Sequence, residues 1–252
     1  GTYNLFSNTF KEMGIECRFV DPAKPEQFAN AIDKKTRCIY AETLPNPKLQ
    51  VFPIAEVSSI GKEHQIPLIM DNTAAPYISK PIQHGANIIV YSTTKYIGGH
   101  GISIGGLLID GGNFDWEAAG DRFKMLNSPD PSYHGAVWTE AAKPLGPIAY
   151  ILRARVILLR DLGAAMSPFN AFTFIQGLET LPLRMQRHCQ NAEKVANFLE
   201  NHNKVERVIY PSLMKDQYLE RAKKHLNEGF GALLGFELKD GVEAGKKFIN
   251  NL

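Results

Sequence analysis

The sequence has few cysteines and lacks any long apolar run. Its 252 residues include only Cys17, Cys38 and Cys189, an odd number without Cys-x-x-Cys spacing, which argues against a disulfide framework and indicates a reducing compartment. No uninterrupted apolar run approaches the roughly 18 residues that a membrane helix needs, and no basic leader followed by an apolar stretch opens the chain. We therefore expect a cytoplasmic protein that does not bind a membrane.

The sequence also lacks an excess of charge of either sign. Lys and Arg number 28 against 26 Asp and Glu, and they are scattered, without the basic stripe that nucleic-acid binding requires. The 7 histidines show no ligand-like pair, which argues against a metal site. The hydrophobic fraction of 44% suffices for one large domain and part of a second. The chain opens on Gly1 and stops at Leu252 inside a helical pattern, so we expect both natural ends to lie outside it.

Short apolar runs alternate with amphipathic segments through the first half of the chain, as expected when helices cross over between parallel strands. We predict strands at Glu16–Asp21, Arg37–Glu42, Pro67–Asp71, Ile88–Tyr91 and Gly105–Ile109. We predict helices at Tyr3–Met13, Pro25–Ile32 and Ile54–His64. Three apolar strands lead into Glu42, Asp71 and Ser92. Ligands of open α/β sheets bind at the carboxyl ends of strands, so we expect these polar residues to share one rim.

The second half of the chain begins irregularly. Residues 114–147 are rich in Pro, Gly and aromatics, which predicts an excursion over the surface or an interface. Helical periodicity returns at Ile148–Leu162 and Leu178–Asn201, and strands are predicted at Val205–Tyr210 and Ala232–Leu238. We predict a large cofactor-binding domain over residues 1–170, and a linking helix with the start of a smaller α+β domain over 171–252.

Lys95 follows the apolar strand at Ile88–Tyr91, beside the hydroxyls of Ser92, Thr93 and Thr94 and before a loop with three glycines. One interpretation is a solvated lysine in a connecting loop. The other is an imine-forming lysine, since a desolvated amine has a lowered pKa and becomes nucleophilic near neutral pH. The neighbouring hydroxyls and backbone N–H groups would then receive a phosphate.

Asp71 ends a second apolar strand, one helix-sized crossover before Lys95. An aspartate in this place is often the N-cap of the next helix. Pyridoxal chemistry, however, needs a carboxylate against the ring nitrogen, because the protonated ring is the electron sink. The spacing predicts that Asp71 and Lys95 lie on neighbouring parts of one rim, and the pair favours this second interpretation.

Asn46 follows a third strand and stands between Pro45 and Pro47. The residue before a proline is pushed into extended geometry, so its amide would be held outward, where it could donate to a phenolate oxygen of the cofactor. An ordinary Asx turn is the alternative.

These motifs together resemble the Cys/Met-metabolism family of pyridoxal-phosphate enzymes. The resemblance rests on Glu42–Pro47, Asp71–Thr73 and Ser92–Gly101, in the family's order and spacing, and extends over nearly the whole chain. Further segments are similar to the O-acetylhomoserine sulfhydrylase branch: Gly112–Trp116, Asp130–Gly135, Leu158–Gly163, Ser167–Phe172 and Gly177–Leu181. The resemblance implies a fold type I transferase, with a mostly parallel sheet flanked by helices and a smaller C-terminal domain.

The resemblance also implies roles for individual residues. Lys95 would be the Schiff-base lysine and proton shuttle of pyridoxal 5'-phosphate, and Asp71 the partner of the ring nitrogen. Ser92 and Thr94 would contact the phosphate, Asn46 the cofactor hydroxyl, and Thr73 would pack near the ring. The family's ring-stacking tyrosine and its substrate-carboxylate arginine are expected outside the chain. Tyr3 and Arg184 are interpreted as packing and structural residues instead.

The implied reaction converts O-acetyl-L-homoserine and sulfide into L-homocysteine and acetate, with the enzyme as a homotetramer. Cystathionine γ-synthase, cystathionine lyase or methionine γ-lyase activity would use the same cofactor residues and stays open, as does the thiol donor. A catalytically silent α/β scaffold is the alternative of another class. A nucleotide-binding protein is disfavoured, because Ile104 stands where the dinucleotide fingerprint needs a third glycine, and Gly61-Lys62 is followed by Glu63.

Overall fold

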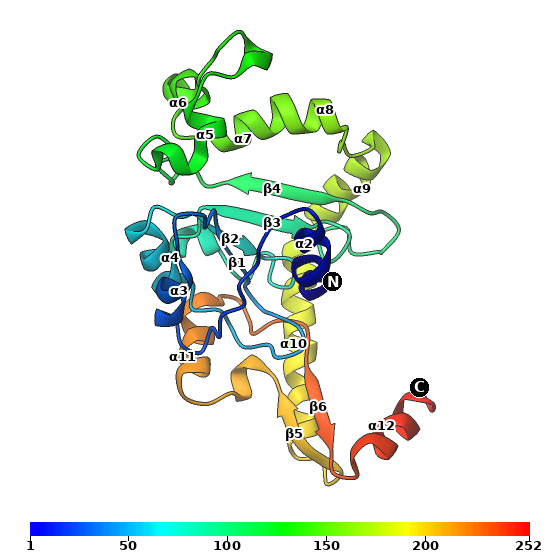
Figure 1. Ribbon diagram of the computed structural model, residues 1–252. Helices are drawn as coiled ribbons and strands as arrows, with labels where there is room; N and C mark the ends of the chain where they lie inside the picture. The colour runs from blue at the N-terminus through cyan, green and yellow to red at the C-terminus, as the bar shows by residue number, and fades with distance from the viewer.

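A four-stranded sheet lies at the centre of the molecule (Figure 1). The computed structural model describes residues 1 to 252. The strands β1 (Ile39–Glu42), β2 (Leu68–Asp71), β3 (Ile88–Ser92) and β4 (Gly106–Asp110) lie in sequence order. The first three are parallel, and β4 runs antiparallel to β3. The predicted α/β fold with a mostly parallel sheet is therefore confirmed.

Helices cover both faces of this sheet because adjacent strand residues point to opposite sides. Ile89 of β3 packs on one face with α3 (Glu26–Ala31) and α4 (Ile54–Glu63). Ile88, the preceding residue, packs on the other face with α6 (Trp138–Ala142) and α7 (Ala149–Arg153). Such two-sided burial explains why β2 and β3 are apolar throughout, as expected of parallel strands.

The N-terminal helical segment lies at the carboxyl ends of the strands (Figure 1). It consists of α1 (Thr2–Asn4), a π-helical turn (Leu5–Thr9) and α2 (Phe10–Glu12), in agreement with the helix predicted at Tyr3–Met13. Thr2 Oγ1 donates to Glu42 Oε1 at 2.7 Å, and the ring of Phe6 packs edge-on against Tyr40. The segment therefore borders the rim on which the candidate site lies.

Residues 114–147 do not form an excursion over the surface. They fold into five short helices around the buried rings of Trp116, Phe123 and Trp138: η3 (Gly120–Phe123), α5 (Lys124–Asn127), η4 (Pro131–Tyr133), α6 and η5 (Lys143–Leu145). Asp130 fastens them, because its carboxylate accepts from Trp138 Nε1 at 2.8 Å and from the backbone N–H of Ser132 at 2.9 Å. The many aromatics of this segment therefore build a core of their own.

A helical path leads from this cluster to a second, smaller sheet. It comprises α7, a π-helical turn (Ala154–Leu159), α8 (Arg160–Leu162), α9 (Pro168–Glu179) and the long α10 (Leu181–Glu200). The single helix predicted at Leu178–Asn201 is wrong at its start. Thr180 separates α9 from α10, because Pro182 in the first turn of α10 lacks an N–H and clashes with a preceding turn.

The second sheet consists of the antiparallel strands β5 (Val205–Ile209) and β6 (Gly235–Leu238). Between and after them lie η7 (Pro211–Leu213), α11 (Asp216–His225) and α12 (Gly241–Ile249). In Figure 1, α10 runs from the large sheet down to this pair of strands. No helix of the protein combines the length and apolarity needed to span a bilayer.

The strand predicted at Glu16–Asp21 is wrong, since these residues adopt no regular structure. Arg18 extends from this segment to Glu16 and Asp33, at 2.7 Å in each case, and Phe19 is exposed. A strand needs a neighbour to pair its backbone groups. Here the alternating pattern reflects side-chain ion pairs at the surface.

His225, at the end of α11, is a buried side chain without a partner at either ring nitrogen. The ring of His84, in the helical turn η2 (Pro81–His84), packs against it edge-on with 4.5 Å between centroids. The charged groups nearby are Lys224 and Arg221 of α11 and Glu56 of α4. Burial first, and then these cations and His84, lower the pKa of His225 to about 4.

This lowered pKa predicts a loss of stability in mild acid. The unfolded chain takes up the His225 proton near pH 6.5, and the folded chain takes it up only near 4. The stabilisation is thus complete above about pH 6.5 and declines as the pH falls towards 4, by at most about 1.4 kcal/mol per pH unit. His225→Leu should remove this part of the slope in denaturant unfolding measured from pH 7 to 4.5. The exposed His188→Leu serves as the control, and equal slopes for His225→Leu and wild type would contradict the assignment.

Candidate active site

The polar ends of β1, β2 and β3 meet at one rim of the sheet, as predicted. Glu42 pairs in register with Asp71, and Asp71 pairs in register with Val90, two residues before Ser92. The backbone N–H of Ser92 donates to Thr73 Oγ1 at 2.8 Å, which ties the segment after β2 to the end of β3. Asp71, Thr73 and Ser92 therefore belong to one cluster.

Two hydrogen bonds fix the carboxylate of Asp71, which is half-buried. Its Oδ1 accepts from the backbone N–H of Thr73 at 2.9 Å, and its Oδ2 accepts from the hydroxyl of Tyr40 at 3.0 Å. Both bonds hold the carboxylate in one orientation. No regular helix begins directly after Asp71, so the interpretation of Asp71 as a helix N-cap is wrong.

Tyr40 is a member of the site that the sequence reasoning missed. Burial, and then the charge of Asp71, raise the pKa of Tyr40 well above its usual range, so its hydroxyl stays protonated and donates. The two-residue spacing along β1 could have indicated Tyr40. Tyr40 lies two residues before Glu42 on the same face of β1, and the register places Asp71 opposite Glu42.

Lys95 lies in the turn directly after β3. Its backbone N–H donates to Ser92 O at 3.2 Å, and its carbonyl accepts from the N–H of Gly99 at 2.8 Å. The Lys95 side chain is exposed and makes no hydrogen bond or ion pair within the chain. The chain by itself therefore leaves this amine open to solvent, and its role as an imine-forming lysine stays a prediction.

The hydroxyls near Lys95 are not equally available. Thr94 Oγ1 accepts from the N–H of Gly105 at 3.1 Å and lies 3.4 Å from the Gly105 carbonyl, so it closes the loop between β3 and β4. Thr73 Oγ1 accepts from Ser92 but can still donate. The Ser92 hydroxyl makes no hydrogen bond within the chain. Among the predicted phosphate contacts, Ser92 is therefore the freer donor, and Thr94 shapes the loop.

Arg184, on α10, fastens the loop that follows Lys95. Its guanidinium donates to the carbonyls of Tyr96 at 2.7 Å, Ile97 at 3.3 Å and Gly177 at 2.7 Å. Its Nε also donates to Thr180 Oγ1 at 3.0 Å. The interpretation of Arg184 as a structural residue agrees with these contacts. The structure adds that two of the three carbonyls it holds belong to the residues directly after Lys95.

Asn46 lies apart from this hydrogen-bonded cluster. It follows β1, its side chain is exposed, and it makes no side-chain hydrogen bond within the chain. The peptide bond between Asn46 and Pro47 is cis. The Asx turn considered as an alternative is therefore absent, and the amide is open to a ligand.

Comparison with known proteins agrees with this architecture. The sequence matches the Cys/Met metabolism PLP-dependent enzyme family over residues 1–252. It is 53% identical to the O-acetyl-L-homoserine sulfhydrylase of Leptospira meyeri over 100% of this chain and 58% of that protein. It is 44% identical to the homocysteine/cysteine synthase of Saccharomyces cerevisiae over 98% of this chain and 55% of that protein. The chain thus spans a little over half the length of these curated relatives.

Solved structures show the same fold. A crystal structure described as an O-acetylhomoserine (thiol)-lyase of Campylobacter jejuni superposes with a TM-score of 0.86 at 40% identity, covering 95% of this chain and 59% of that one. That protein carries a pyridoxyl-lysine phosphate. The O-acetylhomoserine sulfhydrylase of Wolinella succinogenes superposes with a TM-score of 0.82 at 34% identity, covering 99% of this chain and 67% of that one.

Proposed function

Because the chain belongs to the Cys/Met-metabolism family of pyridoxal-phosphate-dependent enzymes, we propose that the protein converts O-acetyl-L-homoserine and sulfide into L-homocysteine and acetate. The observation that carries the proposal is a lysine and a held carboxylate at the carboxyl ends of neighbouring strands, in a chain that is 53% identical to an O-acetyl-L-homoserine sulfhydrylase. Fold and relatives agree on the same chemistry.

The residues at the rim fit pyridoxal 5'-phosphate. Asp71 offers a carboxylate already fixed in orientation by Thr73 and Tyr40, which suits a protonated ring nitrogen. Lys95 offers an amine free of any ion pair within the chain, and Ser92 offers a hydroxyl without a partner in the chain. These groups match three polar parts of the cofactor, the aldehyde, the ring nitrogen and the phosphate, and the exposed amide of Asn46 suits the fourth, the ring hydroxyl.

Each residue then has a defined task. When bound, the cofactor supplies an aldehyde that joins amines and a ring that accepts negative charge. Lys95 would hold the cofactor through its Nζ, and its free amine would move a proton at the α-carbon of the substrate. Asp71 would hold a proton on the ring nitrogen, while Ser92 and Asn46 would bind the phosphate and the ring hydroxyl. Thr94 and Arg184 keep the lysine loop in place.

The reaction balances without an oxidant or reductant. The bond between the γ-carbon and oxygen of O-acetyl-L-homoserine breaks, and acetate leaves with the electron pair. Hydrosulfide (HS⁻) forms the new carbon–sulfur bond at the same carbon, its proton stays on the product thiol, and its negative charge is balanced by the acetate that leaves; a proton removed from the α-carbon returns to it. Lys95, the nearby amine, is the group that we assign to proton transfer.

The test is a direct assay of the intact protein. Incubation with O-acetyl-L-homoserine and sulfide should release homocysteine and acetate in equal amounts. O-succinyl-L-homoserine, cystathionine and methionine should react more slowly. Turnover of cystathionine or methionine with none of O-acetyl-L-homoserine would transfer the assignment to the lyase or γ-synthase branches, and the absence of any turnover and any bound chromophore would favour a silent scaffold.

Replacement of Arg184 by Met should weaken cofactor binding. The change removes hydrogen bonds from a charged donor to three carbonyls, and bonds of this kind make a net contribution of about 1.5–3 kcal/mol each. We expect the dissociation constant of pyridoxal 5'-phosphate to rise at least about tenfold, as measured by dialysis and absorbance. Arg187→Met on the same helix, with an exposed side chain, is the matched control. An unchanged cofactor affinity in Arg184→Met would show that the loop holds its shape without the guanidinium.

We further propose that the protein assembles with copies of itself, as a homotetramer. The support is an apolar stripe on α9, where Phe169, Phe172, Ile175 and Leu178 recur every three residues and are 85%, 61%, 60% and 45% exposed. Contiguous exposed apolar surface of this kind marks interfaces. Light scattering of the wild type and of Phe172→Asp should give a tetramer and a smaller species. Equal masses would remove α9 from the interface.

The division into residues 1–170 and 171–252, and a place in the cytoplasm, also remain our proposals. The three cysteines are all free thiols, which supports a reducing compartment. Limited proteolysis that cuts near residue 170 and leaves two resistant fragments would support the division.

A further inference from the structure

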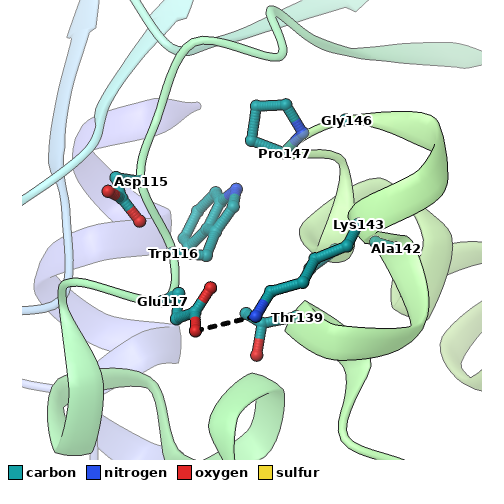
Figure 2. Close-up of a pocket in the computed structure, with 9 residues that line it drawn as sticks. Asp115, Trp116, Glu117, Thr139, Ala142, Lys143, Gly146 and Pro147 are labelled. Atoms are coloured by element: carbon teal, nitrogen blue, oxygen red, sulfur yellow. Dashed lines mark hydrogen bonds and ion pairs between the residues drawn. The ribbon is translucent and has the colours of Figure 1, made fainter.

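A pocket lies at the end of the sheet remote from Lys95. It is formed by Asp115–Glu117, which follow β4, by residues of α6, η5 and α7, among them Thr139 and Lys143, and by Pro147 between η5 and α7 (Figure 2). β4 ends beside the start of β3, since Asp110 pairs with Ile88, whereas Lys95 follows the other end of β3. The cavity has a volume of about 220 Å³, which is below the roughly 300–1,000 Å³ of pockets for drug-sized ligands and therefore admits only a small molecule.

The indole of Trp116 forms the inner wall of this pocket and has an unused donor. The side chain is 3% exposed, and its Nε1 is buried without a hydrogen-bond partner. Figure 2 shows this nitrogen facing the space bounded by Pro147 and Lys143. By contrast, Trp138 Nε1 donates to Asp130 at 2.8 Å. Buried hydrogen-bond donors are almost always paired. We therefore expect a ligand in this pocket to offer an acceptor to Trp116 Nε1.

Packing holds the indole in this orientation. Its ring stacks on Tyr150, with 5.2 Å between centroids and 14° between planes, and meets Phe123 edge-on. The direction of the Nε1–H bond is therefore set by a rigid aromatic cluster, and the donor cannot turn to another partner within the chain.

Charges of both signs surround the mouth. Lys143 Nζ and Glu117 Oε1 lie 3.0 Å apart across it (Figure 2), and Asp115 adds a second carboxylate whose Oδ1 is used by the N–H of Ala118. The ammonium of Lys143 retains further donors, and Glu117 retains a second oxygen. The two carboxylates of Asp115 and Glu117 outnumber the ammonium of Lys143, so a ligand that carries only negative charge is disfavoured. A ligand that carries only an amine has no acceptor for the indole N–H of Trp116.

We propose that this pocket binds a small zwitterionic α-amino acid. Its carboxylate accepts from Trp116 Nε1 and Lys143, its ammonium donates to Glu117, and its aliphatic side chain lies against Pro147 and Ala142. One ligand then satisfies the buried donor and both signs of charge. The site is separate from the Lys95 rim, and the inference does not depend on the proposed reaction.

The experiment follows the indole signal of Trp116 by NMR in the intact protein labelled with 15N-tryptophan, with Trp116→Phe to assign it. The Trp138 signal is the internal reference. L-norvaline should shift the Trp116 signal in a saturable way, with a dissociation constant below about 10 mM. Pentanoate, which lacks the ammonium, and butylamine, which lacks the carboxylate, should bind at least tenfold more weakly.

Variants of the charged pair complete the test. Glu117→Gln and Lys143→Met should each weaken L-norvaline binding at least tenfold, while Glu140→Gln, an exposed residue of α6 outside the pocket, should leave it unchanged. Because Glu117 and Lys143 are more than half exposed, both variants should fold. The proposal is overturned if L-norvaline leaves the Trp116 signal in place, if pentanoate or butylamine binds equally well, or if both charged-pair variants bind like the wild type.

Discussion

Lys95→Ala should lower kcat/KM for O-acetyl-L-homoserine by at least about 1,000-fold. The change removes both the amine that holds the cofactor and the group that moves the α-proton, and proton transfer alone contributes roughly 100- to 10,000-fold. Because the Lys95 side chain is exposed and makes no hydrogen bond or ion pair within the chain, the variant without cofactor should unfold at the same denaturant concentration as the wild type without cofactor. Steady-state kinetics and denaturant titration measure the two effects.

A second readout links the loss to this one amine. Borohydride treatment of the wild type, followed by mass spectrometry, should place a pyridoxyl adduct on the peptide that contains Lys95. The variant should lose both the adduct and the visible absorbance. Lys62→Ala, an exposed lysine on α4, is the matched control and should keep adduct and activity. An adduct that persists at another lysine in Lys95→Ala would refute the assignment.

The sequence was sufficient to place the rim because each of three apolar strands ends in a polar residue and one crossover connects each strand to the next. Apolar runs of strand length end at Glu42, Asp71 and Ser92, and one crossover separates each from the next, so parallel pairing brings their ends together. The register of Glu42 with Asp71 and of Asp71 with Val90 confirms this. Local pattern decides where the strands end, and the parallel direction of the strands decides that their carboxyl ends share an edge.

What the sequence could not supply were contacts between residues far apart in the chain. Arg184 reaches the carbonyls of Tyr96 and Ile97 across 88 and 87 positions, and nothing local to a helical arginine indicates which loop it will hold. The segment after β4 was misjudged for a related reason. Its prolines and glycines suggested surface, but Trp116 and Trp138 gather a core that only the packing of α6 and α7 reveals.

The sequence also does not show which side chains are free to bind a ligand and which are already hydrogen-bonded within the chain. Ser92 and Thr94 look equivalent as phosphate donors, yet Thr94 is bonded to Gly105 and Ser92 is free of protein partners. The motif likewise does not indicate that the side chain of Lys95 is exposed within the chain. Such differences arise from tertiary contacts, so a motif identifies the chemistry of a site before it identifies which hydroxyl performs it.

Asp71→Asn should lower kcat by about 100- to 1,000-fold with little change in stability. The amide has the shape of the carboxylate and can still accept from the N–H of Thr73, but it carries no charge to hold a proton on the ring nitrogen. Loss of one placed electrostatic partner at a reacting centre typically costs a factor of this size. Tyr40→Phe removes only one hydrogen bond to Asp71, worth about 1 kcal/mol, and should lower kcat no more than about tenfold.

Asp110→Asn is the matched control for Asp71→Asn, because Asp110 also ends a strand of the same sheet and is also half-buried. Its carboxylate accepts from the N–H groups of Gly112 and Ile151, on the side of the sheet remote from Lys95. Burial raises the pKa of Asp110, so an amide there replaces a poorly solvated acid and should leave kcat unchanged. If Asp71→Asn and Asp110→Asn had equal kcat values, the carboxylate at the end of β2 would be serving the fold, and the ring nitrogen would need another partner. If Asp71→Asn alone is slow, and Tyr40→Phe lies between it and the wild type, the effect follows the charge that Tyr40 orients.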